Sequence, residues 1–277
     1  MERLIDEMKK DMTLQLYSPR TIKSYMRHIQ DFRNYFDHSV NDLNENDIRE
    51  YLYFIKEDKH YSPAYLSQAF SAIKYLYRET LKMPLTLTKL RGPKRVCRLP
   101  VVLSCEEVKA LLNVVKNKKH RLVLMTTYSA GLRISEATHL KVHDIDSSRM
   151  RIRVVQGKGR KDRYTLLSAL LLTRLREYWR FYKPQDWLFP GRDPWKPLNT
   201  STVGRIFRDA KEKAGINKPA TMHTLRHSFA THLLEKGVGI FQIQRLLGHA
   251  HIQTTMIYFH VMEDHQPTIV SPLDHMM

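Results

Sequence analysis

Histidine and arginine side chains are concentrated in one short segment of this 277-residue chain, which reads HTLRHSFATHLLEKG from position 223. On a helix, His223 and His227 have the i,i+4 spacing of two metal ligands on one face. His223 and Arg226 have the i,i+3 spacing of two donors directed at one anion. A zinc hydrolase would place glutamate at position 224, which is threonine here. The residue types therefore favour an anion site.

Four more residues of suitable chemistry lie in separate segments. Arg133 in AGLRISE follows a glycine where a helix is expected to begin, which is a position that favours anions. Lys158 lies in the glycine-punctuated turn GKGRK, His249 follows the glycine of LLGHA, and Tyr258 lies in TTMIYFHV. Taken singly, each has an ordinary explanation, namely a surface ion pair, a solvated turn, a helix cap and a core tyrosine. Only the combination of these residues in one chain indicates a common function.

The order arginine, lysine, His-x-x-Arg, Gly-His and tyrosine resembles that of the tyrosine recombinases, or phage integrase family. The segments SAGLRISE, GKGRKDR, HTLRHSFATHLL and LLGHAHIQTTMIYFHV are similar to the signature segments of that family. The resemblance is strong over residues 104–262 and less specific over the N-terminal helices. Within the family, the motifs most resemble those of integron integrases and Xer-type recombinases.

This resemblance implies a site-specific DNA recombinase that cuts and rejoins strands through a 3′-phosphotyrosyl intermediate. The catalytic residues that it implies are Arg133, Lys158, His223, Arg226, His249 and Tyr258. The phosphotyrosyl link keeps the bond energy, and cationic and polar side chains take the place of a metal ion. We therefore expect no cofactor and no metal.

The residue types suit attack on a phosphodiester, which adds a second negative charge to the pentacoordinate phosphorus. Arg133 and Arg226 can each direct two N–H donors at the nonbridging oxygens. The phenol of Tyr258 has an ordinary pKa of about 10, so only about one molecule in a thousand is ionised at pH 7. It therefore needs the cations, or a base such as His223, to lose its proton.

Other residues are expected to transfer protons or to support the site. Lys158 is expected to protonate the leaving 5′ oxygen, and Lys161 is a weaker candidate for this task. Glu136 is expected to brace Arg133 or its helix and not to react. The other two histidines of the segment, His227 and His232, are interpreted as structural.

The charge distribution favours a nucleic acid partner. The formal net charge is +18, with 13 Lys+Arg against 13 Asp+Glu in residues 1–88, five cations and no acid in residues 89–98, and 28 cations against 15 acids in residues 99–277. A surface of this kind suits polyphosphate, because each neutralised phosphate releases condensed counterions. An anionic membrane is disfavoured, since no basic amphipathic helix with bulky apolar anchors occurs. A purely solubilising charge is the remaining explanation.

The N-terminal part, about 85 residues long, has the periodicity of about four short helices in a bundle. Two of these helices are expected to start at the Ser-Pro pairs of positions 18–19 and 62–63. The proline- and cation-rich stretch that follows breaks the period and predicts a linker. We expect a core-binding helical DNA-binding domain at 1–88, a basic linker at 89–102, and a catalytic domain with a C-terminal tail at 103–277.

The C-terminal part reads as mostly helical. Ser104 and Glu107 form a predicted capping box, and MRIRVVQ and DRYTLLS predict a β-hairpin with lysines at its tip. The fold class is mainly α, with an N-terminal SAM-like helical bundle and a mixed α/β catalytic domain that contains a small antiparallel sheet. The expected partner is double-stranded DNA bound by a homo-tetramer, with no small-molecule substrate and no membrane.

No signal peptide or membrane span is read, and Cys97 and Cys105 match no disulfide or zinc framework. A cytoplasmic, nucleoid-associated protein is the expectation. Three rival functions remain at this point: a type IB topoisomerase, a metal nuclease and a non-catalytic DNA-binding protein. A nicked duplex in EDTA and a scrambled sequence would distinguish them.

Overall fold

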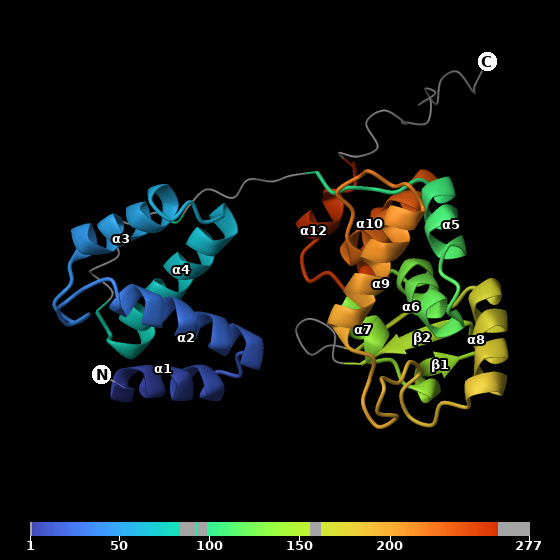
Figure 1. Ribbon diagram of the computed structural model, residues 1–277, viewed down its shortest axis with the longest axis horizontal. Coiled ribbons are helices and arrows are strands. Elements are labelled where there is room, and N and C mark those ends of the chain that lie inside the picture. Colours follow the sequence, from blue (N-terminus) through green and yellow to red (C-terminus); the bar gives the residue numbers. More distant parts are fainter. Residues whose placement is uncertain (1, 84–91, 93–98, 156–161, 260–277) are drawn as a thin grey trace, which may run out of the picture. The chain divides into compact units, whose positions relative to one another are not determined.

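The computed structural model describes residues 2–83, 92, 99–155 and 162–259 of the chain. Its contacts divide the chain into two compact units, Met1–Cys97 and Arg98–Met277 (Figure 1). The division falls inside the stretch 89–102 that we predicted to be a linker. Most of that stretch lies outside the described residues, so its exact limits stay a prediction.

The N-terminal unit is a bundle of helices. They are α1 (Glu2–Leu14), α2 (Pro19–Arg33), α3 (Glu45–Glu57), α4 (Pro63–Tyr75) and the π-helical turn η1 (Leu76–Thr80). The two Ser-Pro starts are confirmed, because the Oγ of Ser18 and the Oγ of Ser62 each accept a hydrogen bond from a backbone N–H of the first turn, at 3.1 and 3.2 Å. The core of this unit includes Phe32, Ile48 and Ile73. The predicted helical bundle is confirmed.

The C-terminal unit surrounds a small sheet with helices. The helices are α5 (Cys105–Asn113), α6 (Lys118–Ser129), α7 (Ile134–Thr138), α8 (Ala169–Tyr182), α9 (Thr200–Lys213), α10 (Met222–Glu235), α11 (Ile240–Leu247) and α12 (Gln253–Met256), with a 3-10 turn η3 (Val142–Asp144). The capping box predicted at Ser104 and Glu107 is present at the start of α5. The predicted fold class is therefore confirmed for this unit as well.

The sheet is a three-stranded antiparallel meander in the order β1-β2-β3. Strands β2 (Arg151–Val154) and β3 (Arg163–Leu166) form the predicted hairpin, in which Arg153 pairs with Tyr164. Strand β1 (Ile145–Asp146) is only two residues long and was not predicted individually, because so short a strand has no periodicity. The hairpin tip, residues 156–161, lies outside the described residues, and with it lie Lys158 and Lys161.

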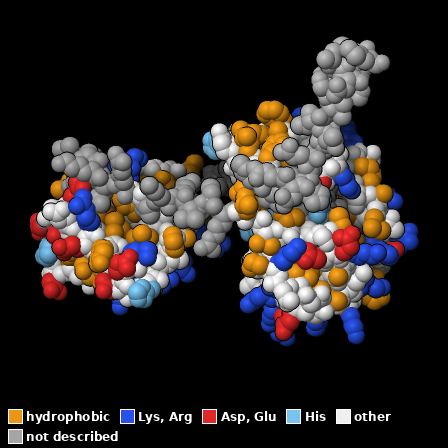
Figure 2. Space-filling view, turned by 90° about the horizontal axis from the view of Figure 1, so that it is seen from above, with side chains coloured by type: hydrophobic (Ala, Val, Ile, Leu, Met, Phe, Trp, Pro, Cys, Tyr) orange, Lys and Arg blue, Asp and Glu red, His pale blue; other side chains and the backbone are white. Residues whose placement is uncertain are grey.

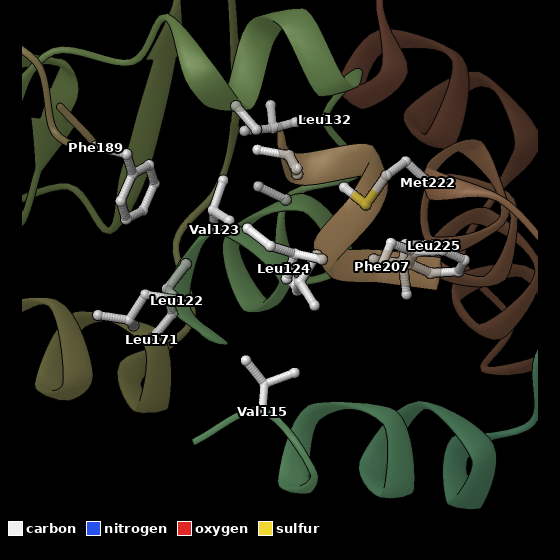
Figure 3. Packing of buried hydrophobic residues seen from close by; sticks show 14 of the residues in the cluster. Val115, Leu122, Val123, Leu124, Leu132, Leu171, Phe189, Phe207, Met222 and Leu225 are labelled. Atoms are coloured by element: carbon white, nitrogen blue, oxygen red, sulfur yellow. The ribbon is translucent and has the colours of Figure 1, made fainter. Parts of the chain in front are cut away.

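Helix α6 forms the centre of the C-terminal unit and contacts α5, α7, α8, α9 and α10. Three consecutive residues of α6, Leu122, Val123 and Leu124, are all buried, so this helix is covered on more than one face. In the view of Figure 3, Leu124 points toward Phe207 of α9 and Leu225 of α10, and Leu122 lies toward Leu171 of α8. Helix α10 is also buried along most of its length, which gives rigid support to any functional group that it carries.

Lys and Arg side chains lie along the edges of the C-terminal unit on the face that Figure 2 shows. Within the ranges that the structure describes, no helix is both long and apolar enough to cross a membrane.

The turn after α6 makes a prediction about stability. Gly131 has φ +61, and a Cβ added there would lie 2.4 Å from Cδ1 of Phe229. Gly131→Ala should lower the free energy of unfolding by about 2–5 kcal/mol, since the left-handed backbone costs roughly 1–2 kcal/mol and overpacking adds roughly 1–3 kcal/mol. Urea denaturation measures this loss.

Gly215 provides the matched control. It has φ +67, but nothing lies within 4 Å of an added Cβ, so Gly215→Ala should show only the backbone cost of roughly 1–2 kcal/mol. Equal losses for the two substitutions would contradict the importance of the contact with Phe229.

Candidate active site

One carboxylate, that of Glu136 on α7, lies among three guanidinium groups. Its oxygens accept hydrogen bonds from Arg133 at 2.7 Å and from both Nη atoms of Arg163 at 2.9 and 2.7 Å. Nη1 of Arg226 lies 3.5 Å from Oε2 of the same carboxylate. Three cations against one anion leave two formal positive charges in a largely buried cluster, which is an arrangement that attracts an anion.

The ionisation of Glu136 follows from this environment. Its side chain is only 6% exposed. Burial alone would raise the pKa of this carboxyl, but hydrogen bonds and charge from Arg163, with the backbone N–H and charge of Arg133, lower the pKa to about 2. Glu136 is therefore a fixed anion at neutral pH, and it holds the guanidinium groups in place.

Arg133 is the most accessible of the three guanidinium groups. Its side chain is 20% exposed, compared with 9% for Arg163 and 4% for Arg226. It is the N-cap residue of α7, and its backbone N–H donates to Oε2 of Glu136 at 2.8 Å. The expectation that Glu136 braces Arg133 and its helix is thus confirmed.

Arg226 is held by the main chain. Its Nη1 donates to the carbonyl oxygen of Gly131 at 2.8 Å and its Nη2 to that of Leu247 at 2.6 Å. The oxygen of Gly131 lies in the turn just after α6, and that of Leu247 ends α11, where helix carbonyls lack partners of their own and carry partial negative charge. Burial lowers the pKa of Arg226 to about 9, so this group remains charged at neutral pH.

Arg163 was not singled out from the sequence. Besides its two bonds to Glu136, its Nε donates to the carbonyl oxygen of Leu246 at 2.9 Å. Gly248, which ends α11 with φ +64, packs on it so closely that an added Cβ would lie 2.6 Å from Cδ of Arg163. Arg163 thereby ties β3 to α7 and to the end of α11. A single arginine at the start of a strand gives no sequence signal of such a role.

Tyr258 follows α12 and is 1% exposed. It belongs to a small second core, separate from the main one, that also contains Phe229, Ile243 and Leu247. Burial raises the pKa of the phenol, while the positive charges of Arg226 and Arg133 act on it in the opposite direction. The folded chain therefore brings this tyrosine into the field of two of the predicted arginines.

The predicted histidines differ in their surroundings. His223 is exposed on α10, and partial desolvation together with the charges of Arg226 and Arg133 lowers its pKa. His249 follows α11 and is half-buried, with its Nδ1 2.9 Å from Oγ1 of Thr255. Burial and then the charges of Arg226 and Arg133 lower the pKa of His249 to about 3. Both imidazoles are therefore neutral at neutral pH.

The two histidines interpreted as structural lie in different places. Nδ1 of His227 is 3.0 Å from Oη of Tyr258, so His227 belongs to the site. Nδ1 of His232 is instead 2.8 Å from Oη of Tyr128, a different phenol. The i,i+4 spacing with His223 had pointed to a metal for His227, and no feature of the sequence indicated a contact with the tyrosine.

Five of the six predicted catalytic residues therefore converge: Arg133, His223, Arg226, His249 and Tyr258. The sixth, Lys158, lies outside the described residues, as does the weaker candidate Lys161. Within the described part of the chain, no three His, Cys, Asp or Glu side chains are grouped as ligands for a metal ion. The arrangement can bind an anion and present a phenol beside it.

Comparison with known families covers most of the chain. The sequence model described as the phage integrase family matches residues 102–265, and the one described as the phage integrase N-terminal SAM-like domain matches residues 4–87. A putative integrase/recombinase, y4qK, of Sinorhizobium fredii is 40% identical over 277 residues, with 99% of this chain and 89% of the relative covered. The tyrosine recombinase XerA of Thermococcus kodakarensis is 37% identical, with 95% and 92% covered.

Solved structures agree with this comparison. A crystal structure of XerA recombinase is 31% identical with a TM-score of 0.55, covering 97% of this chain and 99% of the other. A lambda integrase dimer bound to a core site has a TM-score of 0.78 at 20% identity, with 98% and 99% covered, which is a likeness of fold alone. The chain belongs to the phage integrase family, and it is a tyrosine-type site-specific DNA recombinase.

Proposed function

We propose that Tyr258 is the nucleophile of the recombination reaction and that the guanidinium cluster binds the scissile phosphate. The single observation that carries this proposal is the burial of the Tyr258 phenol within the field of Arg226 and Arg133. The other proposed catalytic residues are His223 and His249, with Lys158 assigned from the sequence motif alone.

The proposed step is a transesterification. Oη of Tyr258 forms a bond to phosphorus, and the bond between phosphorus and the 5′ oxygen breaks. The phenol proton passes to a base, and the leaving oxygen takes a proton, for which Lys158 is the candidate donor. The product is a 3′-phosphotyrosyl link and a free 5′-hydroxyl, and attack by another 5′-hydroxyl reverses the step. The bond energy is retained, so the reaction consumes no nucleotide and needs no cofactor.

Charge explains how the cluster would accelerate this step. The phosphodiester carries one negative charge and the pentacoordinate state carries two, so a cluster with two net positive charges favours the latter. Arg133 and Arg226 are already fixed, by Glu136 and by the carbonyls of Gly131 and Leu247, so little reorganisation accompanies the reaction. Loss of one such donor typically costs about 10²–10³-fold in rate.

The proposed partner is double-stranded DNA bound by four copies of the chain. Each chain supplies one Tyr258, and an exchange between two duplexes needs four cuts. A lambda integrase tetramer bound to a Holliday junction has the same fold as this chain, which supports the proposal. The excess of 28 cations over 15 acids in residues 99–277 suits phosphate contacts. The proposed location is the cytoplasm, at the nucleoid.

Between the two subgroups that the motifs resemble, a Xer-like exchange of duplex sites is the better supported. The XerA relative aligns with nearly all of both chains over 268 residues. Cleavage of a folded single strand in preference to a duplex would favour the integron-type assignment instead.

The first prediction of this proposal concerns the nucleophile. A nicked suicide duplex that carries the recombination site should become covalently attached to the wild-type protein in EDTA, and Tyr258→Phe should abolish the adduct, since this change removes only the attacking oxygen. A denaturing gel detects the adduct. Tyr128→Phe is the matched control, because it removes a phenol that bonds another histidine of α10 outside the cluster. An adduct that persists in Tyr258→Phe would contradict the assignment of Tyr258 as the nucleophile.

A second prediction concerns the ion pair that fixes the site. The pKa of Glu136 falls from 4.5 in the unfolded chain to about 2 in the folded one. Its contribution to stability is therefore complete above pH 4.5 and is lost as the pH falls toward 2. The shift corresponds to roughly 3 kcal/mol.

Urea denaturation at several pH values tests this pH dependence of stability. The difference in unfolding free energy between wild type and Glu136→Gln should be largest above pH 4.5 and should narrow below it. Glu177→Gln, which removes an exposed carboxylate paired with Arg174, should differ little from wild type throughout. A difference between wild type and Glu136→Gln that stays constant with pH would contradict the prediction.

A further inference from the structure

The hydrogen bond to the phenol comes from an unexpected histidine. Of the two histidines one turn apart on α10, the one in contact with Tyr258 is His227, whose Nδ1 lies 3.0 Å from Oη. His223 is exposed, and its ring centre is 6.4 Å from that of His227. The two imidazoles therefore differ in what they can reach: His223 faces solvent, and His227 faces the attacking oxygen.

The direction of this bond follows from the needs of the buried phenol. Among the residues that the structure describes, Oη of Tyr258 makes no second hydrogen bond. A buried hydroxyl hydrogen without an acceptor is costly, so the phenol donates and Nδ1 of His227 accepts. Burial, followed by electrostatic interactions with His223 and Arg226, lowers the pKa of His227 to about 4, which keeps this imidazole neutral and able to accept.

Both partners are held rigidly. Tyr258 is packed in the small second core with Phe229 and Leu247. His227 follows directly after Arg226, whose guanidinium is fixed by two backbone carbonyls. The hydrogen bond is thus a built feature of the site, and it joins α10 to the segment after α12.

We propose that His227 is a catalytic residue, the base that accepts the proton of Tyr258 during strand cleavage. This inference rests on the proposed role of Tyr258 as nucleophile. As the bond between Oη and phosphorus forms, the proton moves from Oη to Nδ1, which gives an imidazolium. In the reverse step the imidazolium returns the proton to Oη as the tyrosine leaves. His223 is then left to contact the phosphate oxygens.

The electrostatics delay this transfer until substrate is bound. In the free protein the phenol is a weak acid and His227 a weak base, so the proton remains on Tyr258. A bound phosphodiester adds negative charge beside the imidazole and favours its protonated form. The charged and titratable groups around the pair come from α10 (His223, Arg226), α7 (Arg133, Glu136), β3 (Arg163) and the segment after α11 (His249).

His227→Asn tests the inference, because the Asn Oδ1 can still accept the hydrogen bond near the place of Nδ1 but has no basicity. The rate of adduct formation on the suicide duplex in a single turnover should fall by about 10²–10⁴-fold, the usual contribution of a general base. DNA affinity should change less than threefold. The variant's rate should rise about tenfold per pH unit between pH 7 and 9, because hydroxide must replace the base, while wild type varies much less.

Two further variants complete the experiment. His227→Gly should regain adduct formation when imidazole is added, which a structural role would not produce. His232→Asn, which alters the other histidine of α10 with a phenol partner, should cleave at the wild-type rate. If His227→Asn does not fold, the imidazole response of His227→Gly decides the question alone.

The outcomes separate this inference from the proposed function. A wild-type protein that forms no adduct overturns the role of Tyr258 itself. A wild type that cleaves, with His227→Asn equally fast or with its slow rate independent of pH, overturns only the role of His227. Absence of any imidazole effect on a folded His227→Gly does the same.

Discussion

The carboxylate of Glu136 is the interaction on which the site depends. Three guanidinium groups of like charge repel one another, and a buried cluster of them would be unstable without an anion at its centre. Glu136 supplies that anion and also caps α7, so one side chain both neutralises part of the charge and fixes a helix. The remaining positive charge is available to an anion.

The main chain does the rest of the positioning. Carbonyl oxygens in the turn after α6 and at the end of α11 hold Arg226, and another near the end of α11 holds Arg163. Helix termini have such unpaired carbonyls by their nature, and a guanidinium has enough donors to serve a carbonyl and a carboxylate together. The same contacts that connect these segments thus orient the guanidinium groups of the candidate site, so the stability of the fold and the geometry of the site depend on one set of bonds.

Local patterns in the sequence predicted what depends on local structure. The Ser-Pro helix starts, the capping box at Ser104 and the β2–β3 hairpin are encoded by adjacent residues, and all are present. The family motifs predicted the residues that converge, although they are far apart in the chain. Neither approach identified Arg163 or His227, because their roles arise from tertiary contacts across more than 20 residues.

Tyr258 and Leu247, whose carbonyl oxygen anchors Arg226, both belong to the small second core, which is distinct from the main one around α6. Small cores open locally at lower free energy than large ones. On heating, loss of this core would displace the phenol of Tyr258 and release the guanidinium of Arg226 together. Activity would therefore be lost at a lower temperature than that at which the whole chain unfolds, and an activity assay would detect the opening of this small core alone.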